Sequence, residues 1–208
     1  MKKLMILMTG IFLGSFAFAQ GQSMGFGLKA GVNFPKYNYS GSNAAYETST
    51  STNFHVTGYL DAPLSTAFSV QPGISLQGKG GKIEIGSFGT YTQNTMWLEI
   101  PVNLVAKVPM GNSNFFVGAG PYIGFGLSGK NKYDSNWGSV EEEFEFGKDG
   151  TLKSTDFGLN FTAGFHLGQG LLLHAGYGLG LTDLVPNNNN SDNKLTNRVL
   201  SVGLGFAL

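Results

Sequence analysis

The last nine residues of the chain alternate strictly between large apolar and small side chains. Leu200, Val202, Leu204, Phe206 and Leu208 are large, whereas every residue between them is serine, glycine or alanine. In a strand, alternate side chains point to opposite faces, so one face here is bulky and apolar and the other is nearly bare. This pattern is typical of a strand that faces lipid on one side and a narrow lumen on the other.

The same period of two recurs along the chain and predicts eight strands. Their outward faces are apolar, and their inward faces carry glycine and polar residues. The predicted strands cover residues 26–34, 54–62, 68–76, 96–104, 115–125, 157–165, 171–181 and 200–208. Pro72, Pro101 and Pro121 interrupt the alternation and predict local breaks in strand pairing.

The connections between these strands alternate in length. Short connections fall near residues 63–66, 108–114 and 168–170, and long ones at 35–52, 78–94, 128–155 and 183–196. Outer-membrane barrels have short periplasmic turns and long extracellular loops. The predicted fold class is therefore all-β, an eight-stranded antiparallel up-and-down transmembrane β-barrel with both termini in the periplasm.

The start of the chain predicts export. Two lysines precede an apolar run at residues 4–16 and an A-x-A site at 17–19, which is the pattern of a secretory signal peptide. The run is too short and too interrupted for a transmembrane anchor. We therefore expect a signal peptide at residues 1–19, an outer-membrane β-barrel domain at 20–208, and localisation in the cell outer membrane.

Composition favours a chain that enters the membrane through strands. Charged residues make up 12% of the chain, about half the usual share, and glycine, at 32 of 208 residues, is about twice as frequent as usual. Two of the 13 basic residues lie in the leader and all 13 acidic residues follow it, so the mature chain is weakly acidic and offers no basic surface to nucleic acid. The absence of cysteine excludes disulfides and thiolate chemistry.

The glycine excess has a steric explanation in this fold. Eight strands enclose an interior that is barely wide enough for side chains. Glycine on the inward faces makes room for the bulky residues predicted there, which are Tyr59, Trp97, Phe116 and Tyr122. A soluble lipocalin-like barrel is the alternative, but it requires an apolar interior and a polar exterior, the reverse of this pattern.

Four stretches of the sequence resemble the PorT-like outer-membrane β-barrel family of Bacteroidota. They are GLKAGVNF at residues 27–34, LEIPV at 98–102, VGAGPY at 117–122 and DFGL at 156–159. The resemblance extends over essentially the whole mature chain and implies an outer-membrane barrel. One member of that family is implicated in protein secretion and gliding, so the resemblance also implies a place in an envelope complex. The chain departs from many outer-membrane barrels in ending with FAL rather than with an aromatic residue.

Four charged residues are predicted to form a polar network in the lumen: Lys29, Asp61, Glu99 and Asp156. Charges in a narrow interior are costly unless they are paired. Lys29 and Glu99 both lie near the middle of their strands, so we expect them to pair across the lumen and close it. A structural plug and a conduction site both use such a set, and the width of an eight-stranded barrel favours the plug.

Two further segments attract a functional interpretation. Residues 124–130 read GFGLSGK and fit G-x-G-x-x-G, but no helix pattern follows and asparagine stands where a P-loop needs serine or threonine. The glycine spacing is therefore interpreted as that of a strand. The acidic run at residues 140–146 is predicted to form a hairpin with 151–153 above the membrane, and its carboxylates are expected to be solvated.

The three histidines, His55, His166 and His174, are predicted to point inward, and the last two flank one short turn. A metal site would need a third ligand and an open position, and the spacing indicates neither. A serine–histidine–aspartate arrangement stays open, because such triads are set by geometry rather than by sequence position. We expect packed or water-bonded histidines, with no metal and no catalytic residue.

The main functional hypothesis is a barrel with a largely filled lumen that acts as a scaffold or interaction module through its extracellular loops. Its expected partners are outer-membrane lipid and an envelope protein, and no cofactor is expected. The first alternative is a narrow pore for small solutes, which would need fewer bulky lumenal residues. The second is an outer-membrane enzyme with a site at the loop rim, which would need a polar cluster at one level of that rim.

Overall fold

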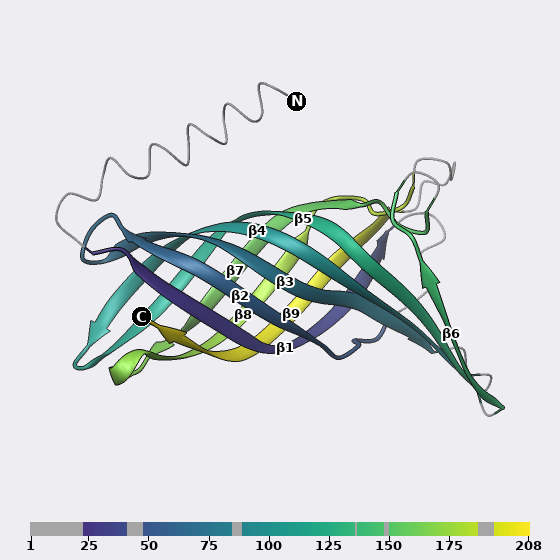
Figure 1. Cartoon of the computed structure of the whole chain (residues 1–208), viewed down its shortest axis with the longest axis horizontal. Helices are drawn as coiled ribbons and strands as arrows, with labels where there is room; N and C mark the ends of the chain where they lie inside the picture. The colour runs from purple at the N-terminus through teal and green to yellow at the C-terminus, as the bar shows by residue number, and fades with distance from the viewer. Residues whose placement is uncertain (1–22, 41–47, 85–88, 136, 148–149, 187–193) are drawn as a thin grey trace, which may run out of the picture.

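The computed structural model describes residues 23–40, 48–84, 89–135, 137–147, 150–186 and 194–208 (Figure 1). These residues contain nine strands and one three-residue 3-10 helix: β1 (Gly25–Ser40), β2 (Asn53–Pro63), β3 (Phe68–Glu84), β4 (Thr90–Met110), β5 (Ser113–Ser135), β6 (Gly138–Phe144), β7 (Thr155–His166), η3 (Gly168–Gly170), β8 (Leu171–Gly180) and β9 (Lys194–Ala207). The signal peptide predicted at residues 1–19 lies outside the described residues. In the described part of the chain, no helix has the length and hydrophobicity needed to cross a membrane.

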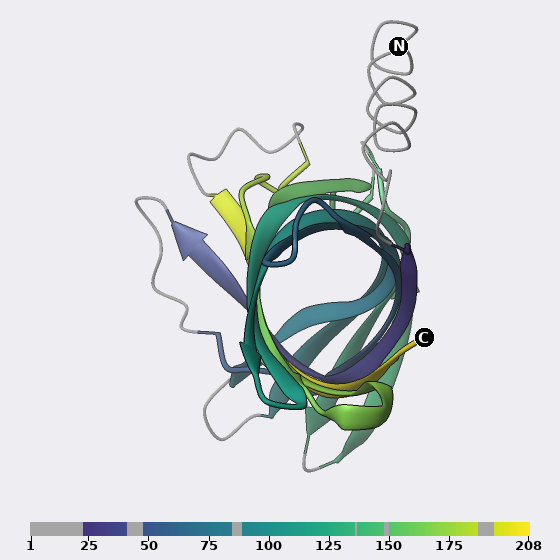
Figure 2. The ribbon, with the colours of Figure 1, turned by 90° about the vertical axis from the view of Figure 1, so that its left-hand side faces the viewer.

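Eight of the strands form a closed antiparallel ring (Figure 1 and Figure 2). The hydrogen-bonded order is β4-β3-β2-β1-β9-β8-β7-β5, and pairing of β5 with β4 closes the ring. The first and last strands, β1 and β9, are neighbours and pair from Gly27 to Ser40. The predicted fold class is confirmed, because each of the eight predicted strands coincides with one strand of this ring.

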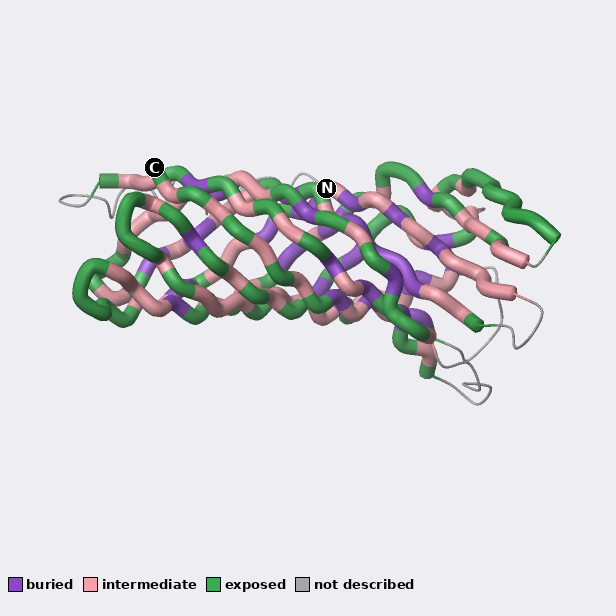
Figure 3. Tube along the Cα trace, turned by 90° about the horizontal axis from the view of Figure 1, so that it is seen from below, coloured by how far each residue is buried: buried purple, intermediate pink, exposed green. Residues whose placement is uncertain are grey.

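The two faces of the ring have the polarity that lipid requires. Buried and exposed positions alternate along the strands (Figure 3). Large apolar residues such as Leu28, Ile74 and Leu204 are about 60% exposed on the outside. The four bulky residues predicted for the lumen are at most 7% exposed: Tyr59, Trp97, Phe116 and Tyr122. A lipocalin-like arrangement, with the apolar face inward, is thereby excluded.

Glycine gives the lumenal rings the space they occupy. A Cβ atom at Gly27 would overlap the ring of Tyr59 on the neighbouring strand. A Cβ atom at Gly164 would lie 2.1 Å from the Leu173 carbonyl oxygen and 2.6 Å from the ring of Phe116. A larger residue at Gly27 therefore requires the Tyr59 ring to move, and at Gly164 the backbone of β8 blocks it as well.

Each of the three prolines lies in a gap of one ladder: Pro72 between β2 and β3, Pro101 between β3 and β4, and Pro121 between β4 and β5. Pairing of β3 with β4 stops at Pro72 and resumes at Ser75. Pairing of β4 with β5 stops at Pro101 and resumes at Leu104. Proline has no backbone N–H to donate, so an interruption at these positions follows from its chemistry.

The strands extend farther at one end of the barrel than predicted. The short turns lie at the same end as the C-terminus and the start of β1 (Figure 1), so this end is periplasmic. Toward the opposite end, β4 and β5 reach 21 and 23 residues, about twice the roughly 9–11 residues that span a membrane. Much of the segments 78–94 and 128–155, expected as loops, is therefore strand.

The acidic segment forms a different hairpin from the one expected. β6 lies outside the ring and pairs with the outer end of β5 (Figure 1). Residues 140–144 pair with β5 rather than with 151–153, because β5 extends beyond the ring and places lysines opposite the acidic strand. The expected hairpin is reduced to an isolated bridge between Phe146 and Leu152 and a hydrogen bond from the Thr151 N–H to the Glu145 carbonyl. Lys130 Nζ of β5, for example, lies 3.2 Å from Glu143 Oε1 of β6. Opposite charges on facing strands favour this register.

Replacing Val202 with arginine tests the lipid-facing surface. Val202 lies in the apolar band and is 44% exposed. The substitution should lower the free energy of unfolding in phospholipid vesicles by about 2–4 kcal/mol, because the charge must enter hydrocarbon. Urea titrations with intrinsic fluorescence measure this change. Ser139→Arg on β6 is the control, and equal losses in the two variants would contradict the assignment of the faces.

Single cysteines test the orientation of the barrel, since the chain has none of its own. Cysteine at Ser139 on β6 should react with a membrane-impermeant maleimide in intact cells. Cysteine at Asn112, in the short turn between β4 and β5, should react only after the outer membrane is permeabilised. The opposite labelling pattern would show that the barrel has the reverse orientation in the membrane.

Candidate functional site

The centre of the lumen contains a buried ion-pair network built around Lys79. Its Nζ lies 2.5 Å from Glu99 Oε1 and 2.8 Å from Asp156 Oδ2. The Tyr122 hydroxyl donates to the same Asp156 oxygen at 3.0 Å, and Asn197 Nδ2 donates to it at 3.1 Å. These side chains come from β3, β4, β7, β5 and β9 respectively, so the network joins five strands across the interior.

The network balances the cost of burying three charges. Lys79, Glu99 and Asp156 are each at most 3% exposed. The ammonium group of Lys79 also lies 4.5 Å from the centre of the Tyr122 ring and 5.4 Å from that of Trp97. Removing one partner of a buried pair is costly because the other charge then stays desolvated and unpaired. Lys79 pairs with both carboxylates, so the charge balance of the buried network depends on this residue.

The predicted lumenal charges point inward, but one pairing differs from the prediction. Glu99 pairs with Lys79, so the expected Lys29–Glu99 pair is wrong. The ammonium group of Lys29 lies instead 4.4 Å from the centre of the Tyr59 ring and 5.5 Å from that of Phe116. The prediction failed because it treated Lys29 as the only cation available to Glu99.

Asp61 belongs to a second charged cluster at the periplasmic end. Its carboxylate contacts Lys107 Nζ, and Gln71 Nε2 donates to Asp61 Oδ1 at 3.0 Å. Asp61 lies near the periplasmic end of β2, away from the Lys79 network in the barrel centre. The structure thus places Glu99 and Asp156 together and Lys29 and Asp61 apart from them.

The sequence analysis missed Lys79 and Lys107. Lys79 fell within residues 78–94, which were assigned to a loop, and Lys107 lay beyond the predicted end of the strand at 96–104. Both continue the inward period of two on their strands: Ser75, Gln77 and Lys79 on β3, and Asn103, Val105 and Lys107 on β4. Continuing the inward period of two beyond the apolar residues of each strand therefore predicts both lysines as lumenal residues.

Two of the three histidines contact each other in the lumen. The Nε2 atoms of His55 and His174 are 3.4 Å apart. His55 Nδ1 lies 2.8 Å from Asn33 Oδ1, while Asn33 Nδ2 donates to the carbonyl of Gly78 at 3.0 Å. Since the Asn33 oxygen is then the acceptor, this network assigns the His55 proton to Nδ1 and makes its Nε2 the acceptor from His174.

The third histidine has a different neighbour. His166 packs edge-on against Phe116, with ring centres 6.1 Å apart, rather than against His174. Within the described ranges, no group of three histidine, aspartate or glutamate residues could hold a metal ion. His55 and His174 thus bond to each other, and His166 packs on an aromatic ring.

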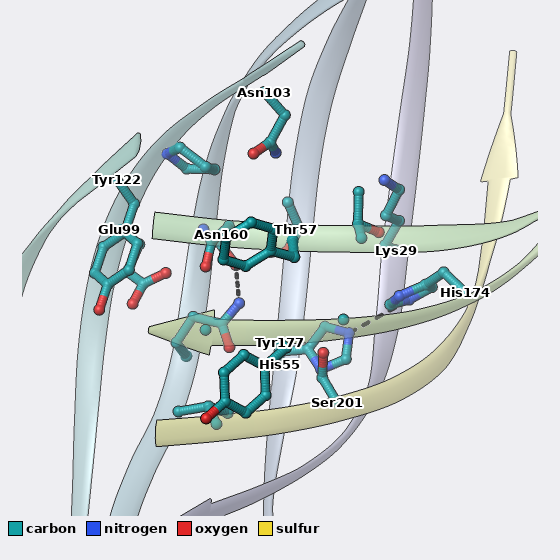
Figure 4. Close-up of a pocket in the computed structure, with 18 of the residues that line it drawn as sticks. Lys29, His55, Thr57, Glu99, Asn103, Tyr122, Asn160, His174, Tyr177 and Ser201 are labelled. Carbon is teal, nitrogen blue, oxygen red and sulfur yellow. Dashed lines mark hydrogen bonds between the residues drawn. The ribbon is translucent and has the colours of Figure 1, made fainter. Parts of the chain in front are cut away.

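A small polar cavity separates the histidine pair from the Lys79 network (Figure 4). Its volume is about 90 Å³, and Lys29, Asn160 and Ser201 contribute to its wall together with residues of both groups. At about 30 Å³ for each water molecule, it holds roughly three waters.

Apolar side chains fill the lumen on both sides of this polar layer. The outer plug, as we name the buried cluster at the extracellular end, consists of Tyr37, Trp97, Leu152, Leu184 and Leu195. Residues that follow β6 also pack on it, and the Trp97 and Phe146 ring centres are 5.0 Å apart. The inner cluster, toward the periplasm, consists of Val105, Phe116 and Leu172. The sequence did not predict the outer plug, because the segments that complete it have no regular period.

The glycine motif has a structural role. All of GFGLSGK, at residues 124–130, lies inside β5. A phosphate-binding loop needs a turn that leads into a helix, and here the chain continues as strand. The interpretation of this motif as strand spacing is confirmed.

The closed ring with an apolar outside and a filled inside defines an integral outer-membrane β-barrel protein. The family model described as "Outer membrane protein beta-barrel domain" matches residues 18–185, and the chain belongs to this family. The match ends before β9, the last strand of the ring. A search of curated proteins gives no match.

Three solved structures illustrate what the chain is similar to. Ail, the attachment invasion locus protein of Yersinia pestis, is 11% identical with a TM-score of 0.45, over 90% of this chain and 100% of that one. OprG from Pseudomonas aeruginosa is 13% identical with a TM-score of 0.48, over 90% and 97%. Neisserial surface protein A is 12% identical with a TM-score of 0.45, over 90% and 99%. At such low identity, these likenesses say nothing about binding or activity.

Replacing Lys79 with methionine tests the central network. The change leaves two buried carboxylates without a cation and should lower the free energy of unfolding by about 3–5 kcal/mol. Urea unfolding in phospholipid vesicles measures the loss. The triple variant Lys79→Met, Glu99→Leu, Asp156→Asn should recover much of it, because packed neutral groups often replace a buried ion pair without loss.

Lys29→Met is the matched control for the same measurement. It removes an inward lysine whose ammonium group lies over aromatic rings rather than against a carboxylate. Its effect should be less than half that of Lys79→Met. Equal effects of the two substitutions would contradict the assignment of Lys79 as the centre of the network.

Proposed function

We propose that this protein is a non-enzymatic interaction module of the outer membrane, exported by a signal peptide at residues 1–19, whose lumen is filled by its own side chains. The observation that carries the proposal is the succession of three layers: the outer plug, the Lys79 network and the inner cluster. Each layer draws on side chains of several strands. A barrel filled at three levels has its binding surface outside the lumen.

The extracellular end offers that surface. β5 and β6 project beyond the ring as a hairpin (Figure 1), and its exposed side chains include Trp137 at 98% and Val140 at 67%. Exposed aromatic residues outside the lipid band are typical of protein contacts. Together with the resemblance to the PorT-like family, this surface supports an envelope protein as the partner and a place in an envelope or secretion complex.

A narrow pore is the second candidate, and one observation favours it. Lys29 lines a cavity large enough for water and has no carboxylate in ion-pair contact among the described residues. A cation in such a position would attract small anions. The pore would require the outer plug and the inner cluster to open, and the closed packing of both favours the interaction module.

The rim-site enzyme receives no support from the histidines. In the described part of the chain, the hydrogen bonds of His55 and His174 run to each other and to Asn33, and none joins either ring to a serine or threonine hydroxyl. Nucleophilic catalysis needs such a hydroxyl–base pair.

Planar-bilayer recordings test the proposal. The purified protein should show no steady conductance above the bare membrane, because side chains occupy the lumen. Trp97→Ala, which removes the largest fully buried side chain of the outer plug, should produce intermittent openings. Trp137→Ala, on the exposed hairpin, is the control and should stay closed. Large steady conductance of the unmodified protein would contradict the interaction module and favour the narrow pore.

A further inference from the structure

A second, larger cavity lies at the extracellular end of the barrel, above the outer plug. Its volume is about 270 Å³, three times that of the central cavity. Tyr37, Leu152 and Leu195 of the outer plug form part of its wall, and Tyr39 and Tyr91 complete an aromatic lining. These tyrosines lie on β1 and β4, at positions beyond the lipid-facing band.

The wall of this cavity is uncharged. None of its described lining residues is aspartate, glutamate, lysine, arginine or histidine. The phenols of Tyr39 and Tyr91 are neutral at physiological pH, and burial raises their pKa further. A charged ligand would lose its hydration here without gaining a counterion, and such a transfer is costly. The cavity therefore favours a neutral ligand.

Polar groups in the wall can accept or donate hydrogen bonds. Tyr37 lines the cavity, but its hydroxyl is fully buried beside Thr95 and is closed to a ligand. Gln93, another wall residue, is held in place by a 2.9 Å bond from its amide nitrogen to Asn131 Oδ1. The hydroxyls of Tyr39 and Tyr91 and the amide of Gln93 are polar groups of the wall that can bond to a ligand hydroxyl.

Glycine and aliphatic residues shape the rest of the cavity. A Cβ atom at Gly81 would lie 2.9 Å from the Tyr37 ring, so this glycine allows the ring to pack against β3. Ile83, Val185 and Pro186 add apolar surface. Flat tyrosine faces with apolar neighbours and a few fixed polar groups suit a ligand that is itself amphipathic.

We propose that this cavity binds one neutral pyranose, either a free sugar or the terminal residue of a glycan. A pyranose has apolar C–H faces that pack on aromatic rings, and hydroxyls around its edge that bond to groups such as the Tyr39 and Tyr91 hydroxyls and the Gln93 amide. The volume, equivalent to about nine water molecules, accommodates one such ring. This inference rests on the proposed interaction function and names one chemical class that the outer face recognises.

Saturation-transfer NMR on the full protein in phosphatidylcholine nanodiscs tests the proposal without sugar-based detergents. Methyl glucoside and methyl galactoside are the neutral probes, glucuronate and glucosamine the charged analogues, and p-cresol the apolar comparator. A neutral hexoside should bind at least about tenfold more tightly than its charged analogues. Maltotriose separates the two sources, because a site for glycan ends accepts it and a site for free sugar accepts only the monosaccharide.

Variants locate the binding. Tyr91→Ala should weaken hexoside binding about tenfold through loss of the stacking ring, and Tyr91→Phe should weaken it less. Phe26→Ala, which removes an exposed aromatic ring at the periplasmic end of β1, should leave hexoside binding unchanged. Heat-dependent mobility on gels verifies that each variant is folded, and the comparison of ligands on the unmodified protein does not depend on any variant.

No transfer to any hexoside, binding of p-cresol alone, or equal affinity of the unmodified protein and folded Tyr91→Ala would overturn the proposal. The conductance test is independent of these outcomes. A closed barrel that binds no sugar would defeat this inference and leave the interaction module in place, whereas a sugar-binding barrel with steady conductance would defeat the interaction module.

Discussion

A sheet that crosses a bilayer must close on itself, because hydrocarbon offers no hydrogen-bond partner to an unpaired strand edge. Here the pairing of β4 with β5 completes that closure, and eight strands set the width of the ring. Every other feature of the interior follows from this width. Aromatic rings fit opposite glycine, as at Gly27 and Tyr59. A charge in the lumen is stabilised by an opposite charge, as at Lys79, or by aromatic rings, as at Lys29.

The Lys79 network accommodates three charges within the narrow lumen of this eight-stranded ring. One cation between Glu99 and Asp156 holds strands from opposite parts of the sequence at fixed separation. Above and below it, the outer plug and the inner cluster exclude water from most of the lumen. The extracellular end lies beyond the lipid and contains additional structure: the extensions of the strands, the β5–β6 hairpin and the uncharged cavity. The molecule thus separates a membrane part, which is filled, from an extracellular part, which presents surfaces.

The fold was predictable because lipid imposes a period of two on every membrane strand, and each of the eight strands shows it. The outer limits of the strands were not, since beyond the lipid both faces of a strand tolerate polar residues and the alternation fades. This is why Lys79 was assigned to a loop and Glu99 to the wrong cation. The outer plug was also unpredictable, because Leu152 and Leu184 reach it from segments without a regular period. Pairing in a lumen depends on the stagger of the strands, which sequence spacing alone does not determine.

The central claim is that side chains fill most of the lumen and close it to bulk water, and chemical accessibility tests it most directly. Ser75 faces the interior at 1% exposure, and the chain contains no other thiol when it is replaced by cysteine. In the folded protein, this cysteine should resist a small methanethiosulfonate reagent added to either side of the membrane, and it should react once urea unfolds the barrel. Reaction in the folded state as fast as that of a cysteine at exposed Ser139 would show an open, water-filled lumen and contradict the account.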